Sequence, residues 1–156
     1  MTDMFSPRER SRIMSKIRSR GNAATELRFI EILKKYKLAG WQRGVNLAGQ
    51  PDFVFLSKKV VVFIDGDFWH GNPRNFRLPK SNISYWEEKI LSNQRRDRRI
   101  SRRLRAQGWG VYRFWQSSLQ NETAVVARLQ RGFSRIRRDS RSRRHQTRRT
   151  AIRPGA

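Results

Sequence analysis

Two aspartates could hold a metal ion beside a phosphate group. Asp52 opens one apolar run of the sequence and Asp65 closes the next. If these runs form a hairpin that turns between Lys58 and Lys59, Asp52 faces Asp65 with Cβ atoms about 4.5–5.5 Å apart. Two like charges there are costly unless a cation lies between them, and carboxylates together with substrate phosphate are common ligands of Mg²⁺. The pattern predicts a metal-dependent phosphodiesterase site, although a different turn length would separate the pair and leave Asp65 in a simple Asp-Gly turn.

A histidine follows the second aspartate closely. His70 lies five residues after Asp65 and is one of only two histidines in the chain. A neutral imidazole can take a proton from water, so His70 is a candidate general base. The alternative is a histidine that forms a local hydrogen bond beside Trp69.

Two further acids interrupt apolar helix faces. A helix expected over 84–107 has an inward stripe spaced by four, three, four, three and four residues, made of Trp86, Ile90, Asn93, Asp97, Ile100 and Leu104. An inward carboxylate needs a partner, and His70 is the candidate for Asp97, with the neighbouring arginines as the alternative. Glu26 similarly interrupts a helix expected over 22–36. It could reach metal-coordinated water or His70, or complement the positive helix N-terminus.

These side chains need a scaffold, which the rest of the pattern supplies. Helices are expected over 6–18, 22–36, 84–107 and 123–136, with Asn22, Ser84 and Thr123 as N-caps. Strands are expected over 51–56, 60–65 and 110–115, and a weaker pattern indicates another over 40–44. The loop 71–84 is long enough to suggest a functional role. The order of elements predicts an α/β layer fold with a small central sheet.

Composition and charge point to a nucleic-acid partner. The 156 residues carry 36 Lys and Arg against 12 Asp and Glu, a formal net charge of +24, which a polyanion would neutralise. The 37% hydrophobic content indicates a folded core, and a charge that only aids solubility is the alternative. Without cysteine, a secretion signal or a membrane-length apolar run, we expect a soluble cytoplasmic protein.

Three parts of the chain are expected to differ in role. Segment 1–21 forms a basic helix with candidate DNA-phosphate contacts at Arg8, Arg12, Lys16 and Arg18. Segment 22–136 is the core, whose long loop adds Arg74 and Arg77 as candidate DNA contacts. Segment 137–156 is rich in arginine and nearly without large apolar residues, so we expect it to be disordered.

An ordered set of motifs resembles the very-short-patch repair endonucleases, a branch of the PD-(D/E)XK nuclease superfamily. The set spans roughly residues 10 to 115 and consists of Met14-Ser15-Lys16-Ile17, Glu26, Gly49-Gln50-Pro51-Asp52-Phe53-Val54, Val62-Phe63-Ile64-Asp65-Gly66-Asp67-Phe68-Trp69-His70-Gly71, Trp86, Glu88-Lys89-Ile90, Asn93, Arg96-Asp97 and Gly108-Trp109.

The resemblance implies a restriction-endonuclease-like, three-layer α/β fold with a small mixed central sheet flanked by helices. It also implies Mg²⁺-dependent cleavage of double-stranded DNA, with Mn²⁺ as a substitute, by a bacterial or phage-encoded protein that we expect to be monomeric. By this resemblance Asp52 and the backbone carbonyl of Ile64 bind metal, His70 serves as base, and Glu26 and Asp97 support them. The aromatic residues that wedge into the base stack correspond to Phe68, Trp69 and Trp86. A core role for these three, above all for Trp86, is the alternative.

The chain departs from this family at two places. The repair enzymes typically bind a structural zinc through cysteines and histidine, whereas the matching positions here are Asp67, Asn72, Arg74 and Ser117, so we expect no zinc. Well-known repair members also have histidine where this chain has Asp65, and the extra carboxylate favours relatives with an Asp-Gly pair, including homing endonucleases.

Three functions therefore compete. The first is a DNA endonuclease, either a mismatch-repair enzyme or a homing or mobile-element enzyme, that uses Asp52 and Asp65 for Mg²⁺ and His70 as base. The second is a non-catalytic DNA- or RNA-binding module on the nuclease scaffold, whose affinity would fall steeply with salt. An RNA-associated protein that uses the arginine-rich tail is the third. The clustered acids and histidine favour the endonuclease.

Overall fold

The computed structural model describes residues 23–135, and its elements follow the predicted order. They are helix α2 (Ala23–Lys35), strands β1 (Trp41–Gln42), β2 (Phe53–Phe55) and β3 (Val60–Asp65), helix α3 (Ile83–Ala106), strand β4 (Gly110–Trp115), and the 3₁₀ turns η1 (Leu56–Lys58) and η2 (Gln116–Gln120). A last helix occupies 122–135. The basic helix expected over 6–18, the tail 137–156 and both predicted domain boundaries lie outside the described residues.

The four strands form one mixed sheet in the order β1-β2-β3-β4. The first two neighbouring pairs are antiparallel, and β3 and β4 are parallel. Parallel neighbours need a crossover connection, and α3 provides it. The small mixed sheet that the resemblance implied is confirmed, and so is the weak strand expected near Trp41.

The predicted register of the β2–β3 hairpin is wrong by two residues. Phe53 pairs with Val62 and Phe55 with Val60, whereas a turn between Lys58 and Lys59 would have paired Phe55 with Val62. The connection is longer than a two-residue turn, because η1 precedes Lys59, which adopts a left-handed conformation at φ 53°. A shift of two residues leaves every side chain on its expected face, but Asp52 no longer lies directly opposite Asp65.

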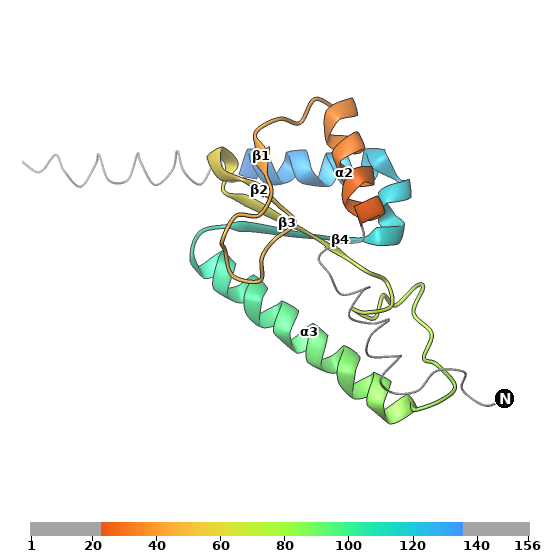
Figure 1. Ribbon diagram of the computed structural model, residues 1–156. Helices are drawn as coiled ribbons and strands as arrows, with labels where there is room; N and C mark the ends of the chain where they lie inside the picture. The colour runs from red at the N-terminus through yellow and green to blue at the C-terminus, as the bar shows by residue number, and fades with distance from the viewer. Residues whose placement is uncertain (1–22, 136–156) are drawn as a thin grey trace, which may run out of the picture.

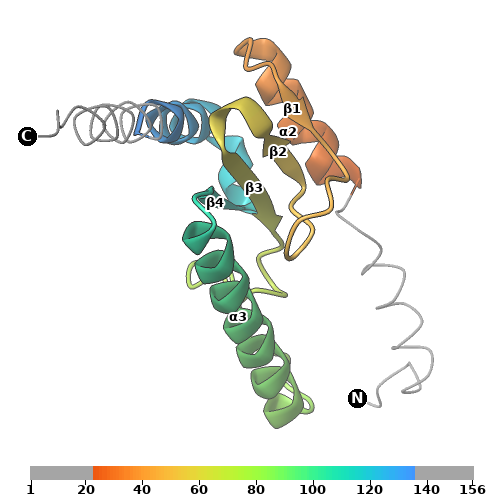
Figure 2. The ribbon, with the colours of Figure 1, turned by 90° about the vertical axis from the view of Figure 1, so that its left-hand side faces the viewer.

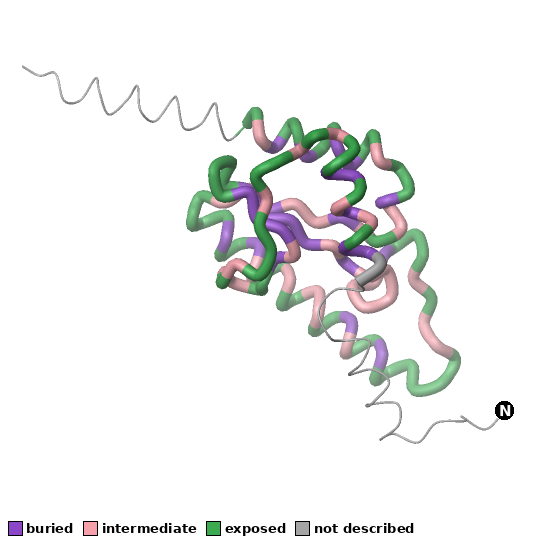
Figure 3. Tube along the Cα trace, turned by 45° about the horizontal axis from the view of Figure 1, so that its top comes forward, coloured by how far each residue is buried: buried purple, intermediate pink, exposed green. Residues whose placement is uncertain are grey.

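Helices cover the two faces of the sheet unequally. α2 and the helix 122–135 lie on one face and α3 crosses the other, so the fold has three layers (Figures 1 and 2). The first face packs a large apolar cluster that includes Phe29, Phe53 and Leu129. The α3 face has a smaller cluster of buried residues, made of Val54, Val61, Phe63, Leu104 and Val111. The buried stretches of Figure 3 follow the strands and the helix sides turned toward them.

The helix ends differ slightly from expectation. The last helix begins at 122, and its cap is Asn121, not Thr123, because Asn121 Oδ1 accepts a hydrogen bond from the Ala124 amide at 3.2 Å. α3 begins before Ser84, and its N-cap residue Asn82 makes no side-chain capping bond. Among the described residues, no helix is both long and apolar enough to cross a membrane.

Candidate active site

The loop after β3 folds back and carries His70 toward the end of the sheet. The His70 amide donates to the Gly66 carbonyl at 3.2 Å, and the Asn72 amide donates to the Asp67 carbonyl at 2.8 Å. These short-range bonds make a compact turn directly beyond Asp65. The histidine thereby comes near the aspartate that precedes it by five residues.

Polar side chains of α3 form hydrogen bonds with the backbone of this loop. Asn93 donates to the Trp69 carbonyl at 2.9 Å, and Gln94 donates to the His70 carbonyl at 3.1 Å. Gly71 has φ 65°, and a Cβ atom there would lie 2.7 Å from Gln94 Nε2. The polar interruption of the helix stripe at Asn93 therefore serves the loop, and the glycine permits its close approach to α3.

Asp97 makes the contact with His70 that the helix phase predicts. The distance between His70 Nδ1 and Asp97 Oδ2 is 2.5 Å. Burial alone would raise the pKa of Asp97, but the hydrogen bond to His70 and the nearby charges of Arg113 and Arg96 hold it below its ordinary value. An ionised Asp97 can therefore accept a hydrogen bond from a protonated Nδ1 of His70. The other ring nitrogen, Nε2, is then available as a base.

Arg113 completes this cluster and escaped the sequence analysis. Its Nε and Nη2 atoms each donate to a different oxygen of Asp65 at 2.7 Å, and Nη2 lies 3.2 Å from Asp97 Oδ1. A signal was available, because Arg113 lies two residues after the buried Val111 and so points to the same face of β4, toward α3. Asp65, His70 and Asp97 present ligand atoms within 4.8 Å of one another.

Asp52 stands at the edge of the cluster. Its Oδ2 accepts a hydrogen bond from the Ile64 amide at 2.7 Å, which joins it to β3 despite the shifted register. Burial and the charge of Asp65 raise the pKa of Asp52, against the lowering effect of the Ile64 bond and of Arg113 and Arg43. An oxygen-only set of Asp52, Asp65 and the Ile64 carbonyl has the chemistry that Mg²⁺ prefers. The charge repulsion at Asp52 is what a cation would relieve, so the residues fit a metal.

Glu26 is directed to a different partner. It is buried at 7% exposure, lies in the first turn of α2 and forms an ion pair with Arg43. Arg43 in turn is close enough to lower the pKa of Asp52. Within the described residues, Glu26 therefore reaches the cluster through an arginine and is not paired with His70.

The three candidate wedge residues pack together beside the cluster. Phe68 lies 5.2 Å from Trp69 and 5.4 Å from Trp86 between ring centroids. Phe76 and Tyr85, which the sequence analysis did not single out, extend this aromatic cluster. Trp86 is only 7% exposed, whereas Tyr85 is 58% exposed. Trp86 is thus part of the packing, and Tyr85 is the member most open to a ligand.

The four positions that match zinc ligands in the resemblance are joined by hydrogen bonds. Ser117 Oγ donates to Asp67 at 2.8 Å, Asn72 donates to Asp67 and to Ser117, and the Arg74 amide donates to Asn72 at 3.1 Å. Asn72 is buried at 3% exposure. This polar cluster ties the His70 loop to η2.

Candidate phosphate contacts flank the cluster. Arg74 and Arg77 are exposed on the loop, as contacts with DNA require. Arg8, Arg12, Lys16 and Arg18 lie outside the described residues. The outer side of α3 adds a row of exposed arginines that includes Arg95, Arg98, Arg99, Arg102, Arg103 and Arg105.

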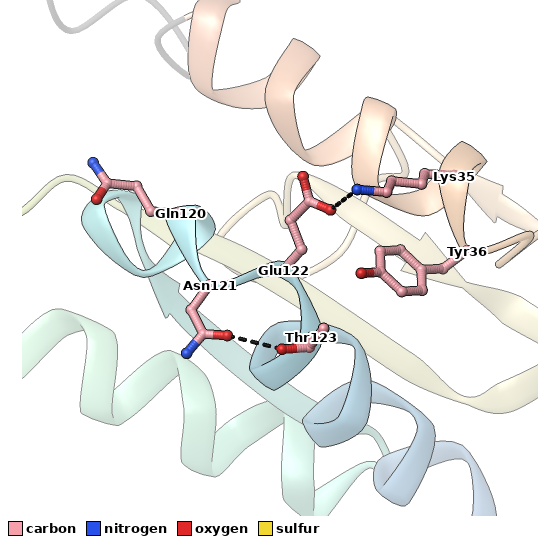
Figure 4. Close-up of a pocket in the computed structure, with 6 residues that line it drawn as sticks. All are labelled: Lys35, Tyr36, Gln120, Asn121, Glu122 and Thr123. Atoms are coloured by element: carbon pink, nitrogen blue, oxygen red, sulfur yellow. Dashed lines mark hydrogen bonds and ion pairs between the residues drawn. The ribbon is translucent and has the colours of Figure 1, made fainter.

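A separate pocket lies between the end of α2 and the start of the last helix (Figure 4). Its lining includes Lys35, Tyr36 and Glu122. Glu122 accepts hydrogen bonds from Arg28 at 2.5 Å and from Lys35 at 2.6 Å. This pocket contains no residue of the carboxylate and histidine cluster, and its acid is already paired with two bases.

Comparison with known proteins identifies the family. Residues 2–75 match the model of the family described as DNA mismatch endonuclease Vsr. The chain is 39% identical over 130 residues to the type II nicking enzyme V.XorIIP of Xanthomonas oryzae pv. oryzae, a match that covers 83% of this chain and 95% of the relative. It is 36% identical over 127 residues to the DNA mismatch endonuclease Vsr of Escherichia coli, covering 81% of each protein. The chain therefore belongs to the Vsr family of DNA endonucleases.

Proposed function

We propose that this endonuclease nicks duplex DNA by Mg²⁺-dependent hydrolysis, with Asp52, Asp65 and His70 at the reacting phosphate. The observation that carries the proposal is the His70–Asp97 hydrogen bond of 2.5 Å beside two further carboxylates. A histidine oriented by an aspartate is an arrangement suited to proton transfer. A non-catalytic binding module would gain little from clustered carboxylates, because they repel phosphate groups.

The metal would be held by oxygen atoms at the end of β3. Asp52 and Asp65 supply carboxylates, and the Ile64 carbonyl supplies a third oxygen. When bound, Mg²⁺ supplies positive charge against the phosphate oxygens, where charge accumulates during hydrolysis. Mn²⁺ prefers similar oxygen ligands, so we expect it to substitute.

His70 and Asp97 would carry out the proton transfer. Nε2 of His70 takes a proton from a water molecule, whose oxygen then forms a bond to phosphorus. The bond from phosphorus to the leaving sugar oxygen breaks, and that oxygen takes up a proton from solvent. Asp97 stabilises the imidazolium that forms in between. Glu26 would support the site through Arg43. This arginine forms an ion pair with Glu26, and its positive charge lowers the pKa of Asp52.

The aromatic cluster and basic residues would hold the DNA. Phe68 and Trp69 would supply the apolar side chains that enter a base step, and Trp86 would support them from the packing behind. Inserting such residues trades unstacking for wider contact. Arg74 and Arg77 would bind phosphates, together with Arg8, Arg12, Lys16 and Arg18. We further propose that the enzyme acts as a monomer, without zinc, in the cytoplasm where its DNA substrate lies.

Mismatch repair is the favoured biological role because mismatched steps open at the lowest cost. The two named relatives are a nicking enzyme and a mismatch endonuclease. A homing or mobile-element endonuclease is the second candidate. Asp65, where the repair enzymes have histidine, favours that alternative.

Cleavage of supercoiled plasmid and of defined duplexes tests the proposal. We expect nicking with Mg²⁺ and none with EDTA, and a faster nick in a duplex with a T:G mismatch than in the matched duplex. His70→Gln should lower the rate by about 10²- to 10⁴-fold, the usual contribution of a general base. His145→Gln, in the tail, is the matched control and should cut like wild type.

Two results would count against the proposal. Cleavage of every substrate by His70→Gln at the wild-type rate would remove the histidine from the reaction. Equal cutting of matched and mismatched duplexes at one long recognition sequence would favour the homing role.

A further inference from the structure

We propose that Arg113 is a positioning residue for hydrolysis, because its guanidinium bridges Asp65 and Asp97 and so fixes the carboxylate that orients His70. The proposal rests on the proposed function, since it concerns the same site. It concerns a residue that neither the family pattern nor the sequence analysis brought forward.

The first support is the geometry of the guanidinium. Two of its nitrogens each bond a different oxygen of Asp65 at 2.7 Å, and one of the two also lies 3.2 Å from Asp97 Oδ1. Arginine presents its donors in a rigid planar fork, so a bidentate pair fixes direction as well as charge. Arg113 therefore sets the relative position of two carboxylates that come from β3 and from α3.

The second support is that the two oxygens of Asp97 have different partners. Oδ1 faces Arg113, and Oδ2 faces Nδ1 of His70 at 2.5 Å. Because the carboxylate is planar, holding one oxygen determines where the other lies. Oδ1 of Asp65 also approaches Nδ1 of His70, but only to 3.8 Å. Without the guanidinium, Asp65 and Asp97 would repel each other and compete for the imidazole.

The third support is the way in which Arg113 itself is held. It lies beside Phe63 in the β3–β4 register, and its Cζ lies 4.5 Å from the centroid of that ring. Its Nη1 is buried and has no hydrogen-bond partner among the described residues. A buried donor left unpaired is costly. The chain tolerates this cost at a position where valine or isoleucine would suit the strand.

Asp65 can serve Arg113 and a metal at the same time. A carboxylate has about four lone-pair positions, and a bidentate arginine uses two of them. The remaining lone pairs stay available to a cation. Arg113 thus replaces no proposed ligand and instead holds Asp65 in place.

The experiment compares Arg113→Lys with Arg128→Lys. Lysine keeps the positive charge beside Asp65 but cannot bridge two carboxylates with a planar fork. Arg128 is a matched control, because it is exposed, donates to the Arg113 carbonyl at 2.9 Å and forms no ion pair with an acid of the site within residues 23–135. We expect Arg113→Lys to lower kcat by about 10- to 100-fold, as is typical for a partner behind a reacting group, while KM changes by less than about twofold.

A second readout uses neither metal nor DNA. The chain has only two histidines, so ¹⁵N spectra can follow His70 with His145 as an internal reference. When the wild-type imidazole carries one proton, we expect that proton on Nδ1, which faces Asp97. In Arg113→Lys we expect a mixture of tautomers, whereas Arg128→Lys should match the wild type.

Wild-type kcat and an unchanged tautomer in Arg113→Lys would overturn the proposal and leave Arg113 as a simple counter-charge. If Arg113→Lys does not fold, the double variant Asp65→Asn, Arg113→Met removes both charges together, and its tautomer is decisive. A retained Nδ1 proton in that variant overturns the proposal, and a mixture supports it. Absence of cleavage by the wild type would instead reject the proposed function, while the spectra would still test the role of Arg113.

Discussion

The two faces of the sheet are packed with different kinds of side chain. The face under α2 and the last helix is filled with apolar side chains such as Phe29 and Leu129, both fully buried. The α3 face is apolar only around Leu104, and toward the end of β3 it holds Asp65, Arg113 and Asp97. The first face is built for stability, and the second gives up part of its apolar packing for a charged site. Changes on the two faces should therefore separate stability from catalysis.

The largest effect on stability is expected on the apolar face. Phe29→Ala removes a fully buried ring whose centroid lies 4.8 Å from that of Phe53. We expect the free energy of unfolding to fall by about 3–5 kcal/mol, measured by urea denaturation. Leu27→Ala, at a neighbouring position that is 58% exposed, should change it by no more than about 0.5 kcal/mol. Equal effects of the two variants would contradict the packing described for this face.

An intermediate effect is expected where the His70 loop is tied to η2. Asn72→Ala removes bonds to Asp67 and Ser117 from a buried site. We expect the free energy of unfolding to fall by about 1–3 kcal/mol, the cost of leaving buried polar groups unpaired. Cleavage should also be slower. Asn75→Ala, at an exposed position of the same loop, is the control for thermal unfolding and nicking. If both asparagines prove equally dispensable, the polar cluster does not hold the loop.

The smallest effect is a gain in stability at the site itself. Because the pKa of Asp52 is raised in the folded state, the folded protein binds this proton more tightly than the unfolded chain. The ionised carboxylate therefore destabilises the fold at neutral pH, and the penalty disappears in acid, where both states are protonated. Asp52→Asn in EDTA should raise the free energy of unfolding by about 1 kcal/mol or less at pH 7. The difference should vanish below about pH 4. A loss of stability at pH 7 would contradict this sign.

The sequence predicts those features correctly whose pattern lies within a single helix or strand. The phase of α3 placed Asp97 inward, and the structure brings it to His70. The run of apolar, β-branched and aromatic residues over 60–65 located β3. The resemblance supplied the layer order, which the sheet confirms.

Features that depend on two elements were harder to predict. The hairpin register was wrong by two residues because it depends on a four-residue connection with a left-handed Lys59. Arg113 and Arg43 were missed as partners of Asp65 and Glu26 because an ion pair between two different elements leaves no spacing in the sequence. In such a basic chain, many arginines compete for each acid. Only the three-dimensional packing selects among them.

Cleavage by Asp52→Asn tests the central claim most directly, because the variant keeps the shape of the side chain and the acceptor for the Ile64 amide. With Mg²⁺ and a mismatched duplex, we expect the single-turnover nicking rate to fall at least about 10²-fold, as the loss of a metal ligand predicts, while the folded protein is no less stable. Nicking at the wild-type rate by a folded Asp52→Asn would contradict the account and place the reaction elsewhere in the molecule.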